Sequence, residues 1–262
     1  MKKIMVLFVA ILLLQNLPVV AQTSAADSLK QLLQIERQDT SRVTLLNLLS
    51  RQYYFNYPDT ALVYGQEALA LARNIGFIKG EVMSLLRIGT VFSVIGNYPK
   101  ALEFNLEALR KAESIKNERF TFNALTNLGI DYGLMGNYRE GINYMLKALD
   151  MARRMDDKLG IFDNLGNLGD AYEKLNILDS ARLYTIQAYD LSIQLNLGGL
   201  PTGLVFNNLG NIYSKMGQDE VAMANYNLSV PLYLKDGNFD GLSEAYLGMA
   251  MLFRRAEAAD SS

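Results

Sequence analysis

The chain has 262 residues, with 25 lysines and arginines against 27 aspartates and glutamates, and a net charge of −2. This balance argues against nucleic acid as a partner, because nucleic-acid-binding surfaces are strongly basic. Histidine and cysteine are both absent, which removes the commonest proton shuttle, the thiolate nucleophile and the usual zinc ligands. We therefore expect no metal, no cofactor and no enzymatic activity.

Residues 1–21 have the features of a secretory signal peptide. Lys2 and Lys3 precede an apolar run from Ile4 to Leu14, and a small-residue cleavage site ends at Ala21. Removal of this segment leaves 23 basic and 27 acidic residues, a net charge of −4. We expect a periplasmic or secreted protein of a Gram-negative bacterium, which would contact a membrane only if the segment stays uncleaved or a further span follows.

Residues 22–40 form a short polar leader and one predicted helix. The helix is expected from Ser28 to Glu36, with Leu29, Leu32 and Leu33 on or near one face.

A block centred on glycine then returns at a nearly fixed interval. The glycines lie 40, 40 and 41 residues apart, and each is followed three residues later by an aromatic residue: Gly89 and Phe92, Gly129 and Tyr132, Gly169 and Tyr172, Gly210 and Tyr213. A period of this size is typical of an array in which each unit buries its apolar face only against its neighbours. The glycines are predicted to be buried where paired helices touch.

Two further series keep the same register. Small residues recur seven positions apart, on one stripe of a second helix: Ala61 and Ala68, Ala101 and Ala108, Gly141 and Ala148, Ala181 and Ala188, Ala222 and Ser229. Between the helices only Asn and Gly occur, at Asn56, Gly96, Gly136, Asn176 and Gly217. These residues tolerate the left-handed conformation that ends a helix, so all five are predicted to have a positive φ.

This order of residues resembles the tetratricopeptide repeat, in its longer variety of about 40 residues. The resemblance covers residues 41–255 as five helix pairs, near 42–74, 80–115, 119–155, 159–195 and 201–235, and a trailing helix near 240–255. Leu49 replaces the glycine of the first unit, as expected of an atypical terminal repeat. The resemblance implies an all-α, right-handed superhelical solenoid of antiparallel helix pairs. We expect residues 256–262 to form a disordered tail.

The same resemblance implies a binding groove. In tetratricopeptide arrays the first helix of each pair lines the concave surface, and the residue two before the repeat glycine points into it. Here this column reads Asn47, Arg87, Asn127, Asn167 and Asn208. Carboxamides could bind the backbone of an extended peptide, or they could join neighbouring helices, and the sequence leaves both possibilities open.

The rest of this face changes in character along the array. Its first half is apolar, with Val43, Leu46, Tyr53, Tyr54, Met83, Leu86 and Val94, whereas its second half is polar, with Asp170, Lys174, Asn211 and Lys215 among its residues. We expect a protein or peptide ligand in this groove.

Two other patterns suggest different chemistry. Asp163, Asp170 and Glu173 share one helix face and could form a general acid/base pair, although a solvated charged face is the simpler interpretation. The run from Asp236 to Gly241 matches the first half of a calcium loop, but Leu247 replaces its glutamate, so a turn explains it.

One further resemblance concerns function. Residues 39–47 and 58–69 are similar to the start of the extracytoplasmic sensor region of Gram-negative membrane histidine kinases and related regulators. This resemblance implies the input region of a signal-transduction protein; the alternatives are a freestanding periplasmic scaffold and, third, a carboxylate-based enzyme.

The trailing helix carries Leu242, Tyr246, Met249, Leu252 and Phe253, which predicts either self-association or a continuation of the chain.

Overall fold

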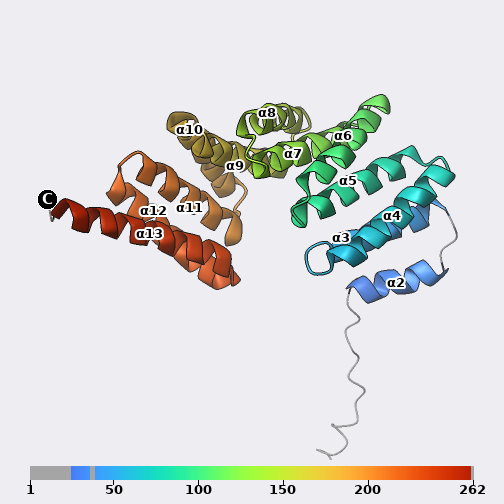
Figure 1. The fold of residues 1–262 in the computed structure, drawn as a ribbon, viewed down its shortest axis with the longest axis horizontal. Coiled ribbons are helices and arrows are strands. Elements are labelled where there is room, and N and C mark those ends of the chain that lie inside the picture. Colours follow the sequence, from blue (N-terminus) through green and yellow to red (C-terminus); the bar gives the residue numbers. More distant parts are fainter. Residues whose placement is uncertain (1–24, 36–38, 261–262) are drawn as a thin grey trace, which may run out of the picture.

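The computed structural model describes residues 25–35 and 39–260, and these form an arch built only of helices and turns (Figure 1). The proposed signal peptide, residues 1–21, lies outside the described residues, as do Ser261 and Ser262. No helix in the described ranges combines the length and the apolar character that crossing a membrane requires.

A short helix, α2 (Ala25–Ile35), precedes five antiparallel pairs and a final helix. The pairs are α3 (Thr40–Tyr53) with α4 (Pro58–Asn74), α5 (Ile78–Val94) with α6 (Tyr98–Ser114), α7 (Glu118–Leu134) with α8 (Tyr138–Arg154), α9 (Lys158–Lys174) with α10 (Leu178–Gln194), and α11 (Leu200–Lys215) with α12 (Asp219–Asp236). The final helix, α13, spans Phe239–Asp260. Residues 256–260, predicted as part of a disordered tail, therefore belong to a helix.

Left-handed residues end the helices at intervals of 20 or 21 residues, from Gly76 to Gly237. Four of the five predicted positive φ angles are confirmed: 77° at Gly96, 78° at Gly136, 58° at Asn176 and 73° at Gly217. The turns between successive pairs also use non-glycine residues, at Lys116, Asp156 and Asn196.

The prediction of a positive φ was wrong at Asn56. In the regular turns a backbone N–H reaches back five residues, as from Asn97 to the carbonyl of Phe92 at 2.8 Å. After α3 the N–H of Tyr57 reaches back only four, to the carbonyl of Tyr53 at 2.8 Å. This closure continues the helical path and needs no left-handed residue.

The repeat glycines bring the two helices of each pair into close contact. Gly129, Gly169 and Gly210 are all buried, as predicted. A Cβ atom on Gly129 would lie 2.7 Å from Cγ of Met145 in the partner helix. The aromatic residues three positions later stack on the same partner helices: the ring centroids of Tyr132 and Tyr144 are 5.5 Å apart, and those of Tyr172 and Tyr184 are 5.4 Å apart.

The first helices of the pairs form the inner layer of the arch. Helices α3, α5, α7, α9 and α11 contact one another in succession, and α13 continues this row by packing on α11 and α12. Helices α6, α8 and α10 lie along the outer edge (Figure 1). The groove is therefore lined mainly by residues of the odd-numbered helices.

Part of the apolar set on α13 is covered by these two neighbours. Leu252 is buried, and Leu242 and Met249 are half-buried against the same core cluster. Tyr246 and Phe253 are 50% and 61% exposed. Of the predicted apolar set, Tyr246 and Phe253 are thus the members that stay exposed.

Candidate binding groove

The predicted column of polar residues divides into structural and accessible members. Asn47 is only 2% exposed, and its amide nitrogen donates to the hydroxyl of Ser84 and to the carbonyl of Val43, both at 2.9 Å. Its predicted place in the groove was wrong, because α5 packs over this position. Val43 and Leu46 are likewise core residues, with no exposed surface.

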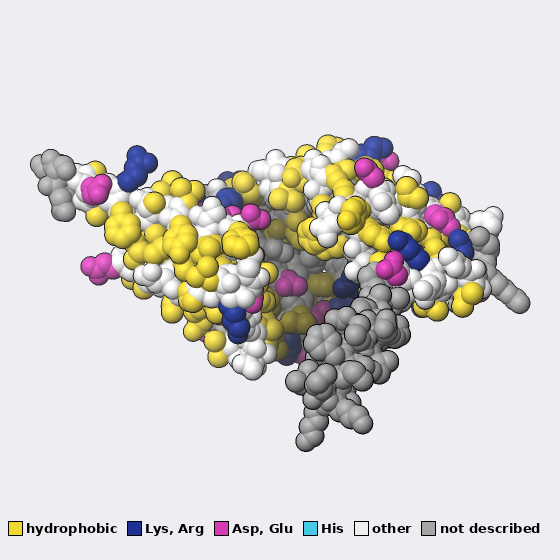
Figure 2. Space-filling view, turned by 90° about the horizontal axis from the view of Figure 1, so that it is seen from below, with side chains coloured by type: hydrophobic (Ala, Val, Ile, Leu, Met, Phe, Trp, Pro, Cys, Tyr) yellow, Lys and Arg dark blue, Asp and Glu magenta, His cyan; other side chains and the backbone are white. Residues whose placement is uncertain are grey.

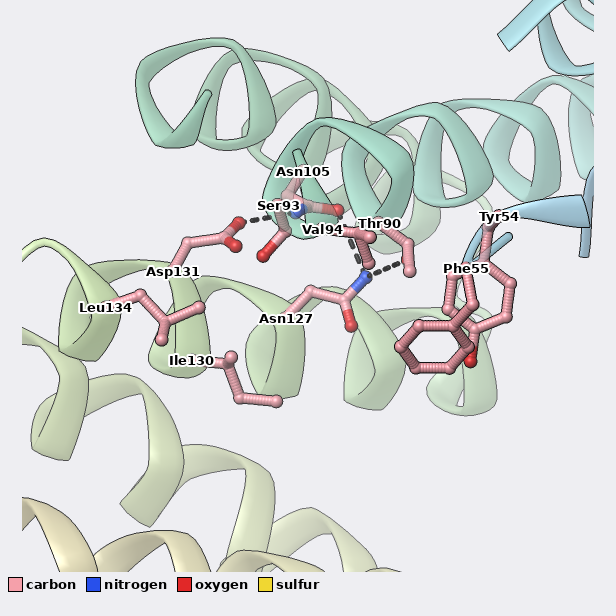
Figure 3. Close-up of a pocket in the computed structure, with 10 residues that line it drawn as sticks. All are labelled: Tyr54, Phe55, Thr90, Ser93, Val94, Asn105, Asn127, Ile130, Asp131 and Leu134. Atoms are coloured by element: carbon pink, nitrogen blue, oxygen red, sulfur yellow. Dashed lines mark hydrogen bonds between the residues drawn. The ribbon is translucent and has the colours of Figure 1, made fainter. Parts of the chain in front are cut away.

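Asn127 has both a structural contact and access to the groove. Its amide donates to the side-chain oxygen of Asn105 at 3.2 Å, and Asn105 donates to Asp131 at 2.8 Å (Figure 3). These residues line a hollow of about 320 Å³, which has an apolar rim that includes Phe55 and Leu134. Asp131 is 1% exposed, and this burial raises the pKa of its carboxyl against the opposing hydrogen bonds from Ser93 and Asn105.

Asn167 and Asn208 are half-buried members of the column that line hollows of the groove. Neither side chain makes a hydrogen bond to another described residue. Their donors and acceptors remain accessible, as binding a peptide backbone requires.

The polar half of the predicted site converges in one hollow of about 400 Å³ near the C-terminal end of the arch. The hollow takes residues from α9, α11, α12 and α13, and five of them are predicted site residues: Asp170, Lys174, Asn208, Asn211 and Lys215. The structure thus places these five residues around one hollow, and their role in binding stays a prediction.

A buried carboxylate fixes two lysines at the base of this hollow. The side chain of Glu173 is 6% exposed, and its oxygens lie 2.6 Å from Nζ of Lys215 and 3.3 Å from Nζ of Lys174. Lys215 also donates to the backbone carbonyl of Glu173 at 3.3 Å. Because two cations compensate one buried anion, this cluster can remain charged in a partly dehydrated groove.

Asp170 adds a second negative group beside these lysines. Its side chain is 54% exposed, and the burial of the remainder raises the pKa of its carboxyl against the attraction of Lys174. Partial burial also acts to lower the pKa of Lys174, but Asp170 and Glu173 outweigh it and raise that pKa. The hollow thus presents charges of both signs.

The carboxylate cluster considered as an enzymatic site is brought together only in part, because Asp170 and Glu173 line the same hollow. Asp163 lines a different hollow from Asp170 and Glu173, and Glu173 is engaged by both lysines.

Several groove residues were missed by sequence reasoning: Ser214, Tyr226, Glu244, Leu247 and Met251. The hydroxyl of Tyr226 donates to the side-chain oxygen of Asn211 at 2.7 Å, and burial, followed by the charge of Glu173, raises the pKa of Tyr226 to about 12. Leu247 and Met251 are 61% and 55% exposed. Extending the register by 40 residues from Asn211 would have predicted Met251, because α13 continues the row of inner helices.

The remaining predicted residue, Arg87, lines a separate hollow of about 440 Å³. Figure 2, which views the arch from below, shows acidic and basic side chains inside the concave face and hydrophobic side chains on the surface around it. The groove is therefore a charged channel with apolar borders.

Comparisons with known proteins agree with this architecture. A family model described as tetratricopeptide repeat matches residues 120–194, and a second model of the same description matches residues 205–236. No curated protein matches the sequence significantly.

Solved structures share the fold at low sequence identity. BtubC from P. vanneervenii superposes with a TM-score of 0.66 at 19% identity, covering 81% of this chain and 88% of that one. NprR in complex with its cognate peptide NprX gives 0.64 at 18% identity, with coverage of 88% and 66%. A Rap protein complexed with Competence and Sporulation Factor gives 0.64 at 14% identity, with coverage of 88% and 69%. Identities this low show a common fold alone.

Proposed function

Since the chain is a tetratricopeptide repeat protein, we propose that it is a binding module, without catalytic activity, that takes an extended peptide or protein segment in its concave groove. The observation that carries this proposal is the convergence of Asp170, Lys174, Asn208, Asn211 and Lys215 in one C-terminal hollow.

The chemistry of this hollow suits a peptide. The side-chain amide of Asn208 has a donor and an acceptor that can bind a peptide backbone. Asn167, one helix pair earlier, has the same groups in a neighbouring hollow. Leu247 and Met251 add exposed apolar surface beside them. An extended segment could thus form main-chain hydrogen bonds and bury apolar side chains at the same time.

We further propose that the module acts outside the cytoplasm as the input region of a signal-transduction protein. Residues 1–21 support export, and the similarity of residues 39–47 and 58–69 to extracytoplasmic sensor regions supports the regulatory role. NprR and the Rap protein, two structures of similar fold, were solved in complex with the cognate peptide NprX and with Competence and Sporulation Factor. The second candidate is a freestanding scaffold, which the exposed Tyr246 and Phe253 of α13 favour.

Peptide display tests the binding function directly. A library of random peptides is selected against residues 22–262, and the enriched peptides are measured by fluorescence anisotropy. We expect enriched peptides to bind the wild-type protein and to lose about 0.5 to 1.5 kcal/mol of binding free energy for each hydrogen bond removed by Asn167→Ala and Asn208→Ala.

The matched control is Asn143→Ala, which changes an exposed asparagine of the outer helix α8. Peptides that bind all three variants as tightly as wild type, or a selection that enriches no peptide, would refute a peptide groove at this face.

A further inference from the structure

Two charged residues line one hollow of the groove from different helices. Arg87 belongs to α5 and Asp163 to α9, and α7 lies between these helices. Their hollow, of about 440 Å³, is separate from the C-terminal hollow that contains Asp170 and Lys174.

The guanidinium of Arg87 has no counterion among the described residues. Its Nε is buried and makes no hydrogen bond there. Burial lowers the pKa of Arg87, and the nearby positive charge of Arg51 lowers it further. A carboxylate placed here would relieve both effects.

Asp163 presents the opposite situation across the hollow. Its side chain is accessible to solvent, and it forms no ion pair with any residue that the structure describes. The surrounding protein raises the pKa of Asp163, and the charge of Asp157 adds to this shift. A cation placed here would be stabilised.

Asparagine side chains line the same hollow as the two charged residues. Asn123 and Asn127 of α7 line the hollow together with Asn164. Asn164 is completely buried, and its amide donates to the carbonyl of Gly160 at 2.9 Å, while its side-chain oxygen has no partner among the described residues. Because Asn164 is completely buried, its oxygen does not reach a ligand, and the accessible amides of this hollow are those of Asn123 and Asn127.

We infer that this hollow binds a peptide segment carrying one acidic and one basic side chain, with the acidic group at Arg87 and the basic group at Asp163. The inference rests on the proposed function, because it assigns ligand chemistry and polarity to the same groove. Packed helices are about 8 to 10 Å apart, so α5 and α9 are separated by roughly 20 Å before side-chain reach is subtracted. An extended strand rises about 3.3 Å per residue, which places the two charges roughly three to six residues apart.

Peptide pools with fixed charges test this inference. Each pool of fluorescent peptides is random at uncharged positions and carries Glu then Lys, Lys then Glu, two Glu, two Lys or two Gln at the inferred spacings. We expect one of the two mixed orders to bind about tenfold more tightly than the other pools, because each charge gains a charge-assisted hydrogen bond.

Substitutions show whether these two residues are responsible. Arg87→Met should remove the preference for the acidic residue, and Asp163→Asn the preference for the basic one. The double variant Arg87→Glu, Asp163→Lys should prefer the opposite order, which a merely structural role would not produce. Arg182→Met with Asp179→Asn, on the outer helix α10, is the control and should change nothing.

The outcomes distinguish a failure of this two-charge site from a failure of peptide binding in general. If the mixed pools bind no better than the others, or if the double variant keeps the wild-type order, the inference is wrong. Display-selected peptides that depend on Asn208 but not on Arg87 or Asp163 would leave peptide binding intact and overturn this site alone. Failure of both the pools and the display selection would overturn both proposals.

Discussion

The side-chain amide of Asn47 in α3 donates a 2.9 Å hydrogen bond to the hydroxyl of Ser84 in α5. Both residues are buried, so this contact joins the inner helices of two successive pairs. Asn167 stands at the same repeat position two residues before its glycine, yet it is half-buried and forms no such bond to a described residue. One position in the repeat thus stabilises the array in one unit and faces the groove in another.

This difference predicts that the same substitution lowers stability at one position and barely changes it at the other. Asn47→Ala leaves Ser84 without its donor in the core and should lower the free energy of unfolding by about 1 to 3 kcal/mol. Asn167→Ala should change it by less than about 0.5 kcal/mol, as expected of an accessible site. Urea titrations of the two variants beside wild type check this, and equal losses would show that Asn167 is structural as well.

The close approach of α7 and α8 predicts a second contrast, between two glycines. A Cβ on Gly141 would lie 2.8 Å from the backbone oxygen of Gly129, which has little freedom to move, so Gly141→Ala should destabilise by about 1 to 3 kcal/mol. A Cβ on Gly133 would find its nearest neighbour at 4.0 Å, the terminal methyl of Met145. Gly133→Ala should therefore stabilise by about 0.5 to 1 kcal/mol through lower chain entropy. Thermal melts that rank the variants in the reverse order would contradict this packing.

The buried carboxyl of Asp131 predicts a pH-dependent effect. Because burial raises its pKa in the folded protein, the charged form is penalised above that raised pKa, and the penalty disappears as the pH falls toward the ordinary value of about 3.8. Asp131→Asn keeps an acceptor for Asn105 and removes the charge. Its melting temperature should exceed that of wild type at pH 7, with a difference that shrinks on acidification.

The control for this prediction is Asp190→Asn, at an exposed position of α10. It should follow the wild-type melting curve across the same pH range. An Asp131→Asn variant that is less stable than wild type at pH 7 would mean that the carboxylate itself stabilises the fold.

Helix α13 predicts reversible self-association with a second copy of the chain. Phe253 continues the register of Tyr132 and Tyr172, which stack on the second helix of their pairs, but it is 61% exposed. At the other end, α2 packs on α3 and exposes Leu32 and Ile35. Helix α2 of one copy can therefore cover α13 of another in a head-to-tail contact.

Sedimentation velocity over a wide concentration range measures this association. We expect the weight-average sedimentation coefficient of residues 22–262 to rise with concentration, and Tyr246→Ser with Phe253→Ser to abolish the rise. Leu183→Ser, which changes an exposed leucine of α10, is the control. A wild-type protein that stays monomeric at the highest concentration would refute the head-to-tail contact.

The fold was predictable because its determinants are local and recur. The small residues and the turn residues each act within one unit, and five units in register identified the helix pairs to within two residues. The prediction of a positive φ at Asn56 was wrong because its turn closes over four residues instead of five. The left-handed Lys116 and Asp156 were missed because non-glycine residues give little signal of that conformation.

The site was predictable only in part, for reasons of packing. Repeat position indicated which residues lie on the inner helices, so Asp170, Asn208 and Lys215 were predicted to line the groove, and all three line one hollow of the structure. It could not indicate that α5 covers Asn47, since that depends on how successive pairs are offset. It also missed Leu247 and Met251, because α13 carries no glycine at the position by which the other units were aligned.

Photo-crosslinking tests the central claim, peptide binding in the concave groove, most directly. A photoreactive phenylalanine analogue replaces Leu247, which lines the C-terminal hollow, or Leu183, which is exposed on α10. We predict that a display-selected peptide crosslinks to the protein labelled at position 247 and not to the protein labelled at 183, and that unlabelled peptide competes. Crosslinking from position 183 alone would place the peptide outside the groove and contradict the account.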